Sequence, residues 1–359
     1  MTDADRAFLF DLLRTPSPTG FETAGQRVWA ARARALADRV ESDAYGNVWA
    51  TRDGTDADAP RVLFEAHADE IGFMVKHVTE DGFLRVDRIG GSDHAIARGK
   101  RVVLLGDHEP VAGVVGNTAI HLRDRSGEEK APKLEELFID IGASSRDEVA
   151  ARGLRVGHPA VYADAVDALT ETRLVGRALD NRLGGFVLTQ VLAQLAEGTP
   201  HGATVHALNA VQEEIGGNGA RMAAYAIRPD VAVVLDVTHA TDSPGIDHAK
   251  HGEVRLGAGP TVTHGTVNHP AVVARLEAVA AAEGIPLQHE ASSRFSGTDT
   301  DVIFSSRAGI PSALVSIPMR YMHSTVETVD LRDVEHAARL LTAFARSLRA
   351  GDAFRAEIL

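Results

Sequence analysis

Residues from about 71 to 165 show almost no helical periodicity, whereas the chain on either side alternates strand-like and helical stretches. This central part contains short β-type runs separated by Gly and Asp turns, namely IGFMVKHV, GFLRVDRI, KRVVLLG and VAGVVG. Such spacing is typical of a small barrel or sandwich. The change of pattern therefore predicts an α/β domain made of two separate segments, with a β domain inserted between them.

The two outer segments have the pattern of a sheet covered by helices. Four near-continuous apolar runs predict strands at 61–66, 203–211, 231–237 and 312–318. Helices are predicted at 3–14, 21–38, 181–197, 269–283 and 332–348, and a short one near 145–152 within the insertion. Strands without polar alternation are buried on both faces. We therefore predict a three-layer α/β/α catalytic domain of residues 1–70 and 166–359, and an inserted β-barrel domain of residues 71–165.

Composition excludes several classes of protein. The net charge of −13 argues against a nucleic-acid surface. Cysteine is absent, which excludes disulfides and thiolate metal sites and fits a reducing cytosol. No apolar run approaches the roughly 18 residues that a membrane helix needs, and the N-terminus carries acids where a secretory signal would carry basic residues. We expect a cytoplasmic protein with no nucleic-acid or membrane partner.

Polar residues that can bind metal ions stand where several predicted strands end. His67 follows the strand at 61–66, Glu214 follows the strand at 203–211, and Asp236 ends the run VAVVLD. His323 comes shortly after the last strand, and Asp180 stands just before a helix. Ligands of open α/β sheets bind outside the carboxyl ends of the strands. These side chains are therefore predicted to converge on one crevice.

Two imidazoles and three carboxylates form a site that suits Zn, Co or Mn. Five protein ligands exceed the three of a single catalytic zinc, but they suit two metals that share a bridging carboxylate. Such a pair of ions would also explain the adjacent Glu213 and Glu214, with Glu214 on a metal and Glu213 facing the attacking water. Each residue alone has an ordinary explanation as a helix cap, a core histidine or a solvated acid, so only the joint placement is informative.

Six ordered motifs resemble those of a known peptidase family. They are EAHADEIGFMV, VGRALDNRLGG, VQEEIGGNGA, VLDVTHATDSPG, SGTDTD and RYMHSTVETV. Together they resemble the glutamyl/tetrahedral aminopeptidase family, metallopeptidase family 42 of the di-zinc exopeptidases. The resemblance covers nearly the whole chain. It also separates the chain from carboxypeptidase- and acylase-like relatives, whose extra domain lies later in the chain.

The resemblance implies a role for each of these residues. It implies that His67 and Asp236 bind one metal, that Glu214 and His323 bind the other, and that Asp180 bridges the two. Glu213 would be the general base and acid, and Asp69 would orient the imidazole of His67. It further implies a cis Asp180–Asn181 peptide. We expect Zn²⁺ in both positions, with Co²⁺ or Mn²⁺ as alternatives.

The activity implied is removal of an N-terminal residue from a short peptide with a free α-amine. The motifs SGTDTD and RY suggest Asp299, Arg320 and Tyr321 as substrate-binding residues, although Asp299 could equally cap a helix. Family members form dimers and twelve-subunit tetrahedral particles through the inserted barrel. Side-chain preference cannot be read from the sequence.

Three other functions remain open at this point. The same di-metal site could serve another amide hydrolase, such as a deblocking enzyme or an N-deacetylase. An endoglucanase-type glycosidase would use two carboxylates and generally no metal. A non-catalytic binding relative would not need to keep Glu213.

Overall fold

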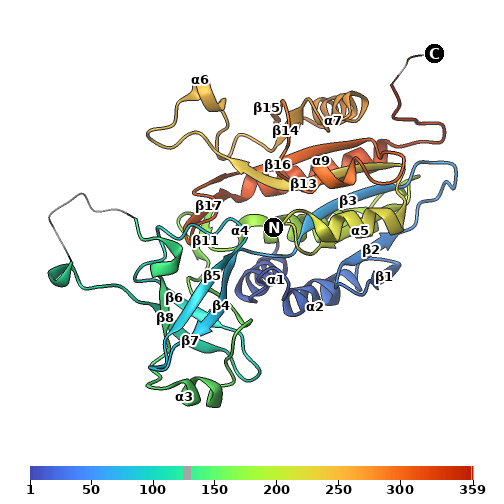
Figure 1. Ribbon diagram of the computed structural model, residues 1–359. Coiled ribbons are helices and arrows are strands. Elements are labelled where there is room, and N and C mark those ends of the chain that lie inside the picture. Colours follow the sequence, from blue (N-terminus) through green and yellow to red (C-terminus); the bar gives the residue numbers. More distant parts are fainter. Residues whose placement is uncertain (124–130, 357, 359) are drawn as a thin grey trace.

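The computed structural model describes residues 1–123, 131–356 and 358. It contains one large mixed sheet and one separate closed barrel (Figure 1). Residues 124–130 of the predicted insertion lie outside the described residues.

The large sheet has eleven strands with a parallel centre. Along the sheet the order is β1 (Arg39–Ser42), β2 (Val48–Arg52), β12 (Val205–Ala210), β3 (Val62–His67), β13 (Val231–His239), β16 (Ser312–Arg320), β17 (Glu327–Asp330), β11 (Arg173–Gly176) and β10 (Asp167–Ala168). A further pair, β14 (Thr261–His264) and β15 (Gln288–Ala291), joins this sheet at β16. Strands β12, β3, β13 and β16 run parallel to one another, so their carboxyl ends lie at one edge of the sheet.

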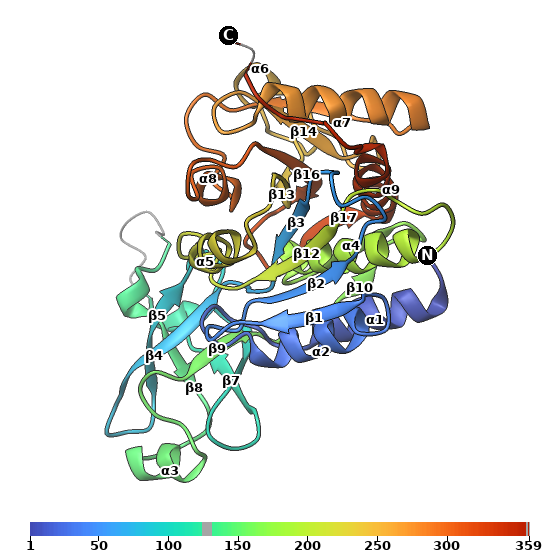
Figure 2. The same cartoon turned by 90° about the vertical axis from the view of Figure 1, so that its right-hand side faces the viewer.

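Helices cover both faces of this sheet. One face carries α1 (Asp3–Arg14), α2 (Thr23–Ala33), α4 (Leu179–Ala196), α7 (Pro270–Glu283) and α9 (Leu331–Ser347). The other carries α5 (Asn218–Ile227) and α8 (Thr300–Ile303), and α6 (His248–His251) lies in a loop outside these layers. Figure 2 shows α5 and α8 on one side of the central strands and α4 and α9 on the other.

Alternation along the strands separates the two cores. In β3 the side chain of Phe64 packs with the core under α4 and α9, whereas Leu63 packs with the core under α5 and α8. Both are fully buried. Because successive side chains of a strand point to opposite faces, an uninterrupted apolar run is what a sheet between two helix layers requires.

The barrel lies beside the sheet and has its own core. Its closed order is β4 (Gly72–Val78), β5 (Leu84–Ile89), β8 (Phe138–Asp140), β7 (Val111–Val115), β6 (Arg101–Leu104) and β9 (Pro159–Tyr162). The same part of the chain holds α3 (Arg146–Ala151) and two 3₁₀ turns, Ile120–Leu122 and Leu134–Glu136. Phe73, Leu84, Ile139 and Tyr162 are among its buried residues.

The predicted fold class is confirmed: helices cover an α/β sheet on both faces, and a small barrel is present. The predicted strands and helices are found within a few residues, except that the helix predicted at 21–38 ends at Ala33 because the chain turns there to enter β1. The domain boundaries at 70 and 166 stay a prediction. None of the helices in the described part of the chain is both long and apolar enough to span a bilayer.

Candidate metal centre

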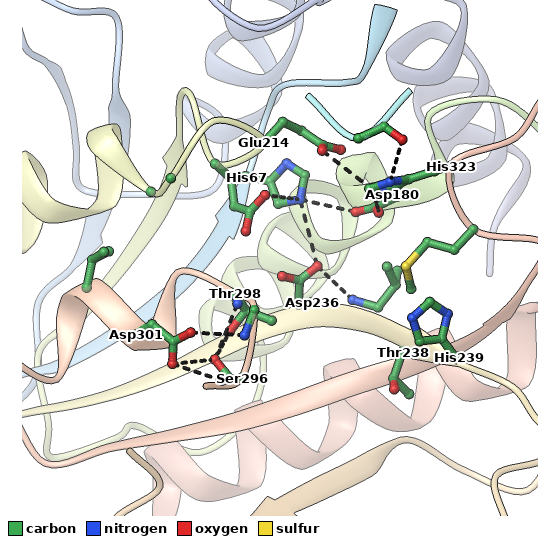
Figure 3. A pocket seen from close by; sticks show the side chains of 18 residues that line it. His67, Asp180, Glu214, Asp236, Thr238, His239, Ser296, Thr298, Asp301 and His323 are labelled. Carbon is green, nitrogen blue, oxygen red and sulfur yellow. Dashed lines mark hydrogen bonds and ion pairs between the residues drawn. The ribbon is translucent and has the colours of Figure 1, made fainter. Parts of the chain in front are cut away.

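The five residues predicted to bind metal ions lie together where the parallel strands end (Figure 3). His67 is the last residue of β3, and Asp236 belongs to β13. Glu214 follows β12, and His323 follows β16. Asp180 stands in the first turn of α4. Side chains from five separate parts of the chain therefore line one cavity, whose volume is about 670 Å³.

The imidazole of His67 faces two carboxylates. Its Nε2 lies 3.1 Å from Asp180 Oδ1 and 3.7 Å from Asp236 Oδ1. Its Nδ1 donates a hydrogen bond to the backbone carbonyl of Asp69 at 3.2 Å. Because a carbonyl can only accept, Nδ1 carries a proton. Nε2 is the nitrogen that faces the carboxylates, and it hydrogen-bonds to Asp180.

The imidazole of His323 is arranged in the same way. Its Nε2 lies 3.3 Å from Asp180 Oδ2 and 3.5 Å from Glu214 Oε2, and its Nδ1 donates to the backbone carbonyl of Gly91 at 3.2 Å. A Cβ at Gly91 would overlap the ring. This glycine follows β5, so the predicted insertion contributes a residue to the wall of the cavity.

Asp180 stands between the two imidazoles. One of its carboxylate oxygens faces His67 and the other faces His323. The predicted cis Asp180–Asn181 peptide is present. Two overlapping sets of possible metal ligands result, and Asp180 belongs to both: His67, Asp180 and Asp236 form one, and Asp180, Glu214 and His323 form the other.

Glu327, which sequence analysis missed, holds this arrangement from behind. Its Oε2 accepts hydrogen bonds from the backbone N–H groups of Leu179 at 2.9 Å and Asp180 at 3.3 Å. Its Oε1 accepts from the backbone N–H of His323 at 3.1 Å. One buried carboxylate thereby fixes the backbone of two predicted ligands. Its only sequence signal is its place four residues after His323.

The adjacent glutamates face different halves of the site. Glu213 Oε2 lies 3.9 Å from His67 Nε2, whereas Glu214 Oε2 faces His323. The chain then turns through Gly216 and Gly217, whose φ angles of 116° and 70° favour glycine. The pair therefore stands at the rim of the cavity, with one carboxylate beside each imidazole.

Burial and mutual repulsion perturb the acids of the cavity. Burial raises the pKa of Glu213 to about 10, of Glu214 to about 8 and of Asp236 to about 7, and neighbouring carboxylates act in the same direction. Burial would also raise the pKa of Asp180, but its hydrogen bonds to the two imidazoles lower that pKa below the ordinary value.

The imidazoles respond in the opposite sense. Burial would lower the pKa of each ring, but hydrogen bonds to Asp180 outweigh it. They raise the pKa of His323 to about 9 and that of His67 well above its ordinary value. The shifts of both kinds follow from the close approach of imidazoles and carboxylates around Asp180.

These observations fit a pair of divalent metal ions. Glu214 Oε1 is buried and has no hydrogen-bond partner in the described part of the chain, although buried carboxylates normally need one. Both Nε2 atoms point inward, and both Nδ1 atoms are held by backbone carbonyls, as is usual for histidine ligands. The mix of imidazole and carboxylate suits Zn, Co or Mn.

The three residues suggested for substrate binding do not line the cavity. Asp299 is fully buried at the start of α8, and its side chain makes no helix-capping hydrogen bond. Its burial and the neighbouring Glu65 raise its pKa well above the ordinary value. The Arg320 guanidinium donates to Asp242 Oδ1 at 2.7 Å. Tyr321 is half exposed. None of the three is among the residues that line the cavity.

Other side chains form the wall where substrate would lie. The lining includes Thr238 and His239 at the end of β13, and Ser296, Thr298 and Asp301 before and within α8. Asp301 orders this segment, since its carboxylate accepts from the backbone N–H groups of Ser296 at 3.0 Å and Gly297 at 2.9 Å. The SGTDTD motif therefore does reach the cavity, but through residues other than Asp299.

A sequence model of the M42 glutamyl aminopeptidases matches residues 46–340 of the chain. Among curated proteins, a lysyl aminopeptidase of Pyrococcus furiosus is 36% identical over 346 residues, which are 95% of this chain and 96% of that protein.

Solved structures agree with this match. The aminopeptidase APDkam598 of the archaeon Desulfurococcus kamchatkensis is 35% identical with a TM-score of 0.88, and the alignment covers 96% of this chain and 95% of that one. The TET1 peptidase of Pyrococcus horikoshii, which can assemble into a tetrahedron or a large octahedral shell, is 28% identical with a TM-score of 0.83 over 95% of this chain and 99% of its own.

Proposed function

The chain belongs to the M42 glutamyl aminopeptidase family, whose members are metal-dependent. We propose that it removes N-terminal residues from short peptides, and that two divalent metal ions bound in the central cavity support this reaction. It is an aminopeptidase, a hydrolase that acts on peptide bonds. We further propose the identity and number of the metal ions and the roles of individual residues in this activity.

One observation carries the proposal: Asp180 presents one oxygen to each of two imidazoles. A bridging carboxylate with a histidine on either side is the arrangement that two neighbouring ions require. In the proposed site His67 and Asp236 would hold one ion, Glu214 and His323 would hold the other, and Asp180 would contribute to both. Zn²⁺ is the expected metal, with Co²⁺ or Mn²⁺ as alternatives.

The ions would supply Lewis-acid chemistry, in which they polarise the scissile carbonyl and lower the pKa of water. The protein supplies the proton transfer. Glu213 stands beside His67 without belonging to either ligand set. It would accept a proton from the attacking water and deliver it to the amine that leaves. Nearby cations would also lower the raised pKa of Glu213. This lowering is needed because a general base must be deprotonated at neutral pH.

Asp69 and Glu327 would act as positioning residues. Asp69 fixes His67 through its backbone carbonyl, and its carboxylate lies 3.5 Å from the same Nδ1. Glu327 fixes the backbone at Asp180 and His323. Neither side chain faces the substrate in this proposal.

The substrate would be a short peptide with a free N-terminus. The cavity of about 670 Å³ has room for a few residues. From the composition and charge of the chain we propose that the enzyme is cytoplasmic and has no nucleic-acid or membrane partner.

We also propose that the chain associates with copies of itself. The proposal rests on the Pyrococcus horikoshii peptidase, which assembles into shells, and on exposed apolar residues of the barrel region. Exposed apolar side chains there include Val114, Ile120, Leu122 and Val156. A shell such as that of the Pyrococcus horikoshii peptidase would cover such residues. Sedimentation of the purified chain should give dimers or a twelve-subunit particle, and a strictly monomeric species would contradict this part.

Metal removal and a substrate panel test the activity. Dialysis against a strong chelator should abolish hydrolysis of aminoacyl anilides, and Zn²⁺, Co²⁺ or Mn²⁺ should restore it. Full activity in protein shown by elemental analysis to be metal-free would overturn the metal-dependent mechanism. Metal-independent hydrolysis of a glycoside, without hydrolysis of the anilides, would favour a glycosidase. Turnover of acylated peptides in preference to free N-termini would favour a deblocking enzyme or an N-deacetylase.

A further inference from the structure

A second group of possible metal ligands lies outside the central cavity. It consists of His264 at the end of β14, His289 in β15 and Glu277 in α7. Figure 1 shows these three elements together, at the side of the sheet beyond β16. The small cavity that contains His264 and Glu277 shares no lining residue with the central one.

The fold explains why the three side chains meet. β14 and β15 run parallel, and His289 stands opposite Val262. Because side chains two residues apart in a strand share a face, His264 lies on the same face as Val262. Val262 is buried in the core that α7 covers, so both imidazoles project toward the helix that carries Glu277.

The donor atoms form a compact triangle. His264 Nε2 lies 3.0 Å from His289 Nδ1, and Glu277 Oε1 lies 3.6 Å from each of them. Ligand atoms of a tetrahedral zinc site with bonds of about 2.0–2.1 Å stand about 3.3–3.4 Å apart. The observed edges bracket that spacing, so one ion could contact all three atoms after shifts of a few tenths of an ångström.

The contacts within the group place two ring nitrogens and one carboxylate oxygen around one point. The two ring nitrogens share one hydrogen bond, so one ring must donate and the other accept. The rings stack with centroids 5.2 Å apart. The two imidazoles are the ion-pair partners of Glu277 within the described part of the chain.

We propose that His264, Glu277 and His289 bind a divalent transition-metal ion, an additional site that is independent of the central pair. Two imidazoles and one carboxylate select Zn²⁺, Ni²⁺ or Cu²⁺ over Mg²⁺ or Ca²⁺. All three side chains are partly exposed, so water completes the coordination. In the described residues β15 pairs with β14 alone, and the ion ties this edge strand to α7.

The position of the site gives it a structural consequence. Thr263 and Glu290, which alternate with the two histidines, line a neighbouring cavity of about 360 Å³. That cavity shares Thr238, Ser296 and Thr298 with the central one. An ion on the outer face of β14 and β15 therefore stabilises a wall of the substrate region without entering it.

Zinc counting on the full-length protein tests the proposal. Metal-depleted parent protein, H264Q/H289Q and E277Q are each dialysed to equilibrium against a series of Zn²⁺ concentrations near neutral pH, and bound zinc per subunit is measured by elemental analysis. H77Q/H121Q, which removes two exposed histidines of the barrel region, is the matched control.

We expect the parent and H77Q/H121Q to bind one more zinc ion per subunit than H264Q/H289Q. E277Q keeps both imidazoles and should bind that ion at least tenfold more weakly. The difference between parent and variant does not depend on how many ions the central cavity takes, so failure of the proposed catalytic centre would leave this comparison intact. Equal zinc counts in parent and H264Q/H289Q at every concentration would overturn the additional site.

Unfolding temperatures give a second readout. Zinc that binds only the folded protein raises its stability. The gain on adding zinc should therefore be smaller in H264Q/H289Q and E277Q than in the parent and the control. An identical gain in all four proteins would contradict the proposed link between β15 and α7.

Discussion

The carboxylate of Asp69 accepts a hydrogen bond from the backbone N–H of Glu213 at 3.0 Å through Oδ1, while its Oδ2 accepts from the backbone N–H of Glu214 at 3.2 Å. The same oxygen accepts from the Thr19 hydroxyl at 2.8 Å. A residue expected from the resemblance to orient His67 thus also fixes the backbone of both glutamates. Asp69 is fully buried, so these bonds are not exchanged for water.

Replacing Asp69 with Asn tests this positioning. Asn keeps one acceptor oxygen but turns the other into an amide donor, which would face a backbone N–H. We expect a loss of metal affinity of about 10–100-fold, as for other supporting partners of metal ligands, together with a lower kcat. Metal titration and steady-state rates on D69N measure both, with D167N as a control on an exposed aspartate. Parental affinity and kcat would show that Asp69 positions neither His67 nor the glutamates.

The fold and the meeting of the five proposed ligands in one cavity could be predicted because their signals are local or ordered along the chain. An apolar run that ends in His67 or Asp236 marks both a buried strand and a polar residue at its carboxyl end. Parallel strands then bring such ends together. Helix α5 was not predicted, since it begins in a run of glycines and uses alanines to pack.

Residues whose partners come from distant segments could not be predicted. Asp299 looked like a pocket residue or a helix cap, but its place beside Glu65 follows from how α8 packs on β13 and β16, next to β3. Arg320 looked available for substrate, but Asp242 occupies its guanidinium. No pattern in the sequence reveals that Asp299 lies beside Glu65 or that Arg320 pairs with Asp242.

Glu327 provides the second prediction. Its carboxylate accepts three backbone hydrogen bonds at Leu179, Asp180 and His323. In E327Q one oxygen is replaced by an NH₂ group that cannot accept them. The bridging Asp180 and His323 should then be less well fixed, so metal affinity should fall about 10–100-fold.

Metal titration and elemental analysis of E327Q check this expectation, and E283Q, at an exposed position, is the control. The metal should be lost chiefly from the half of the site that contains His323. Unchanged affinity with an intact fold by circular dichroism would contradict the role assigned to Glu327.

The pH dependence of stability is the third prediction. In the metal-free protein the folded state raises the pKa of Asp236 to about 7, of Glu214 to about 8, of His323 to about 9 and of Glu213 to about 10. A group with a raised pKa stabilises the fold below its ordinary pKa, and this contribution is lost as pH rises through the folded value. The unfolding temperature of metal-free protein should therefore fall as pH rises from about 7 to about 10.

Metal ions should weaken that dependence because they replace the protons. The rings of His67 and His323 must be neutral to bind metal, so affinity should itself increase with pH. Thermal unfolding across this pH range, with and without Zn²⁺, measures both effects. E213Q lacks one of the titrating carboxyls and should show a smaller fall when metal-free. A metal-free protein whose stability is flat or rises over the range would show that these groups do not retain protons.

The last prediction separates the two adjacent glutamates. Glu213 faces His67 but belongs to neither ligand set, whereas Glu214 belongs to the set with His323 and Asp180. E213Q should therefore fold normally and retain both metal ions. Its kcat should fall by at least about 10²–10⁴-fold, which is typical of a lost general acid–base and corresponds to roughly 3–5 kcal/mol of activation barrier.

E214Q should behave differently, because the amide is a poorer ligand than a carboxylate. One metal should bind more weakly, and activity should be partly recovered at high metal concentration. Metal analysis and steady-state rates on the two purified variants distinguish the roles, and each variant serves as the matched control of the other. If E213Q kept near-parental activity, or if E214Q bound both ions as tightly as the parent, the roles of the two glutamates would have been assigned wrongly.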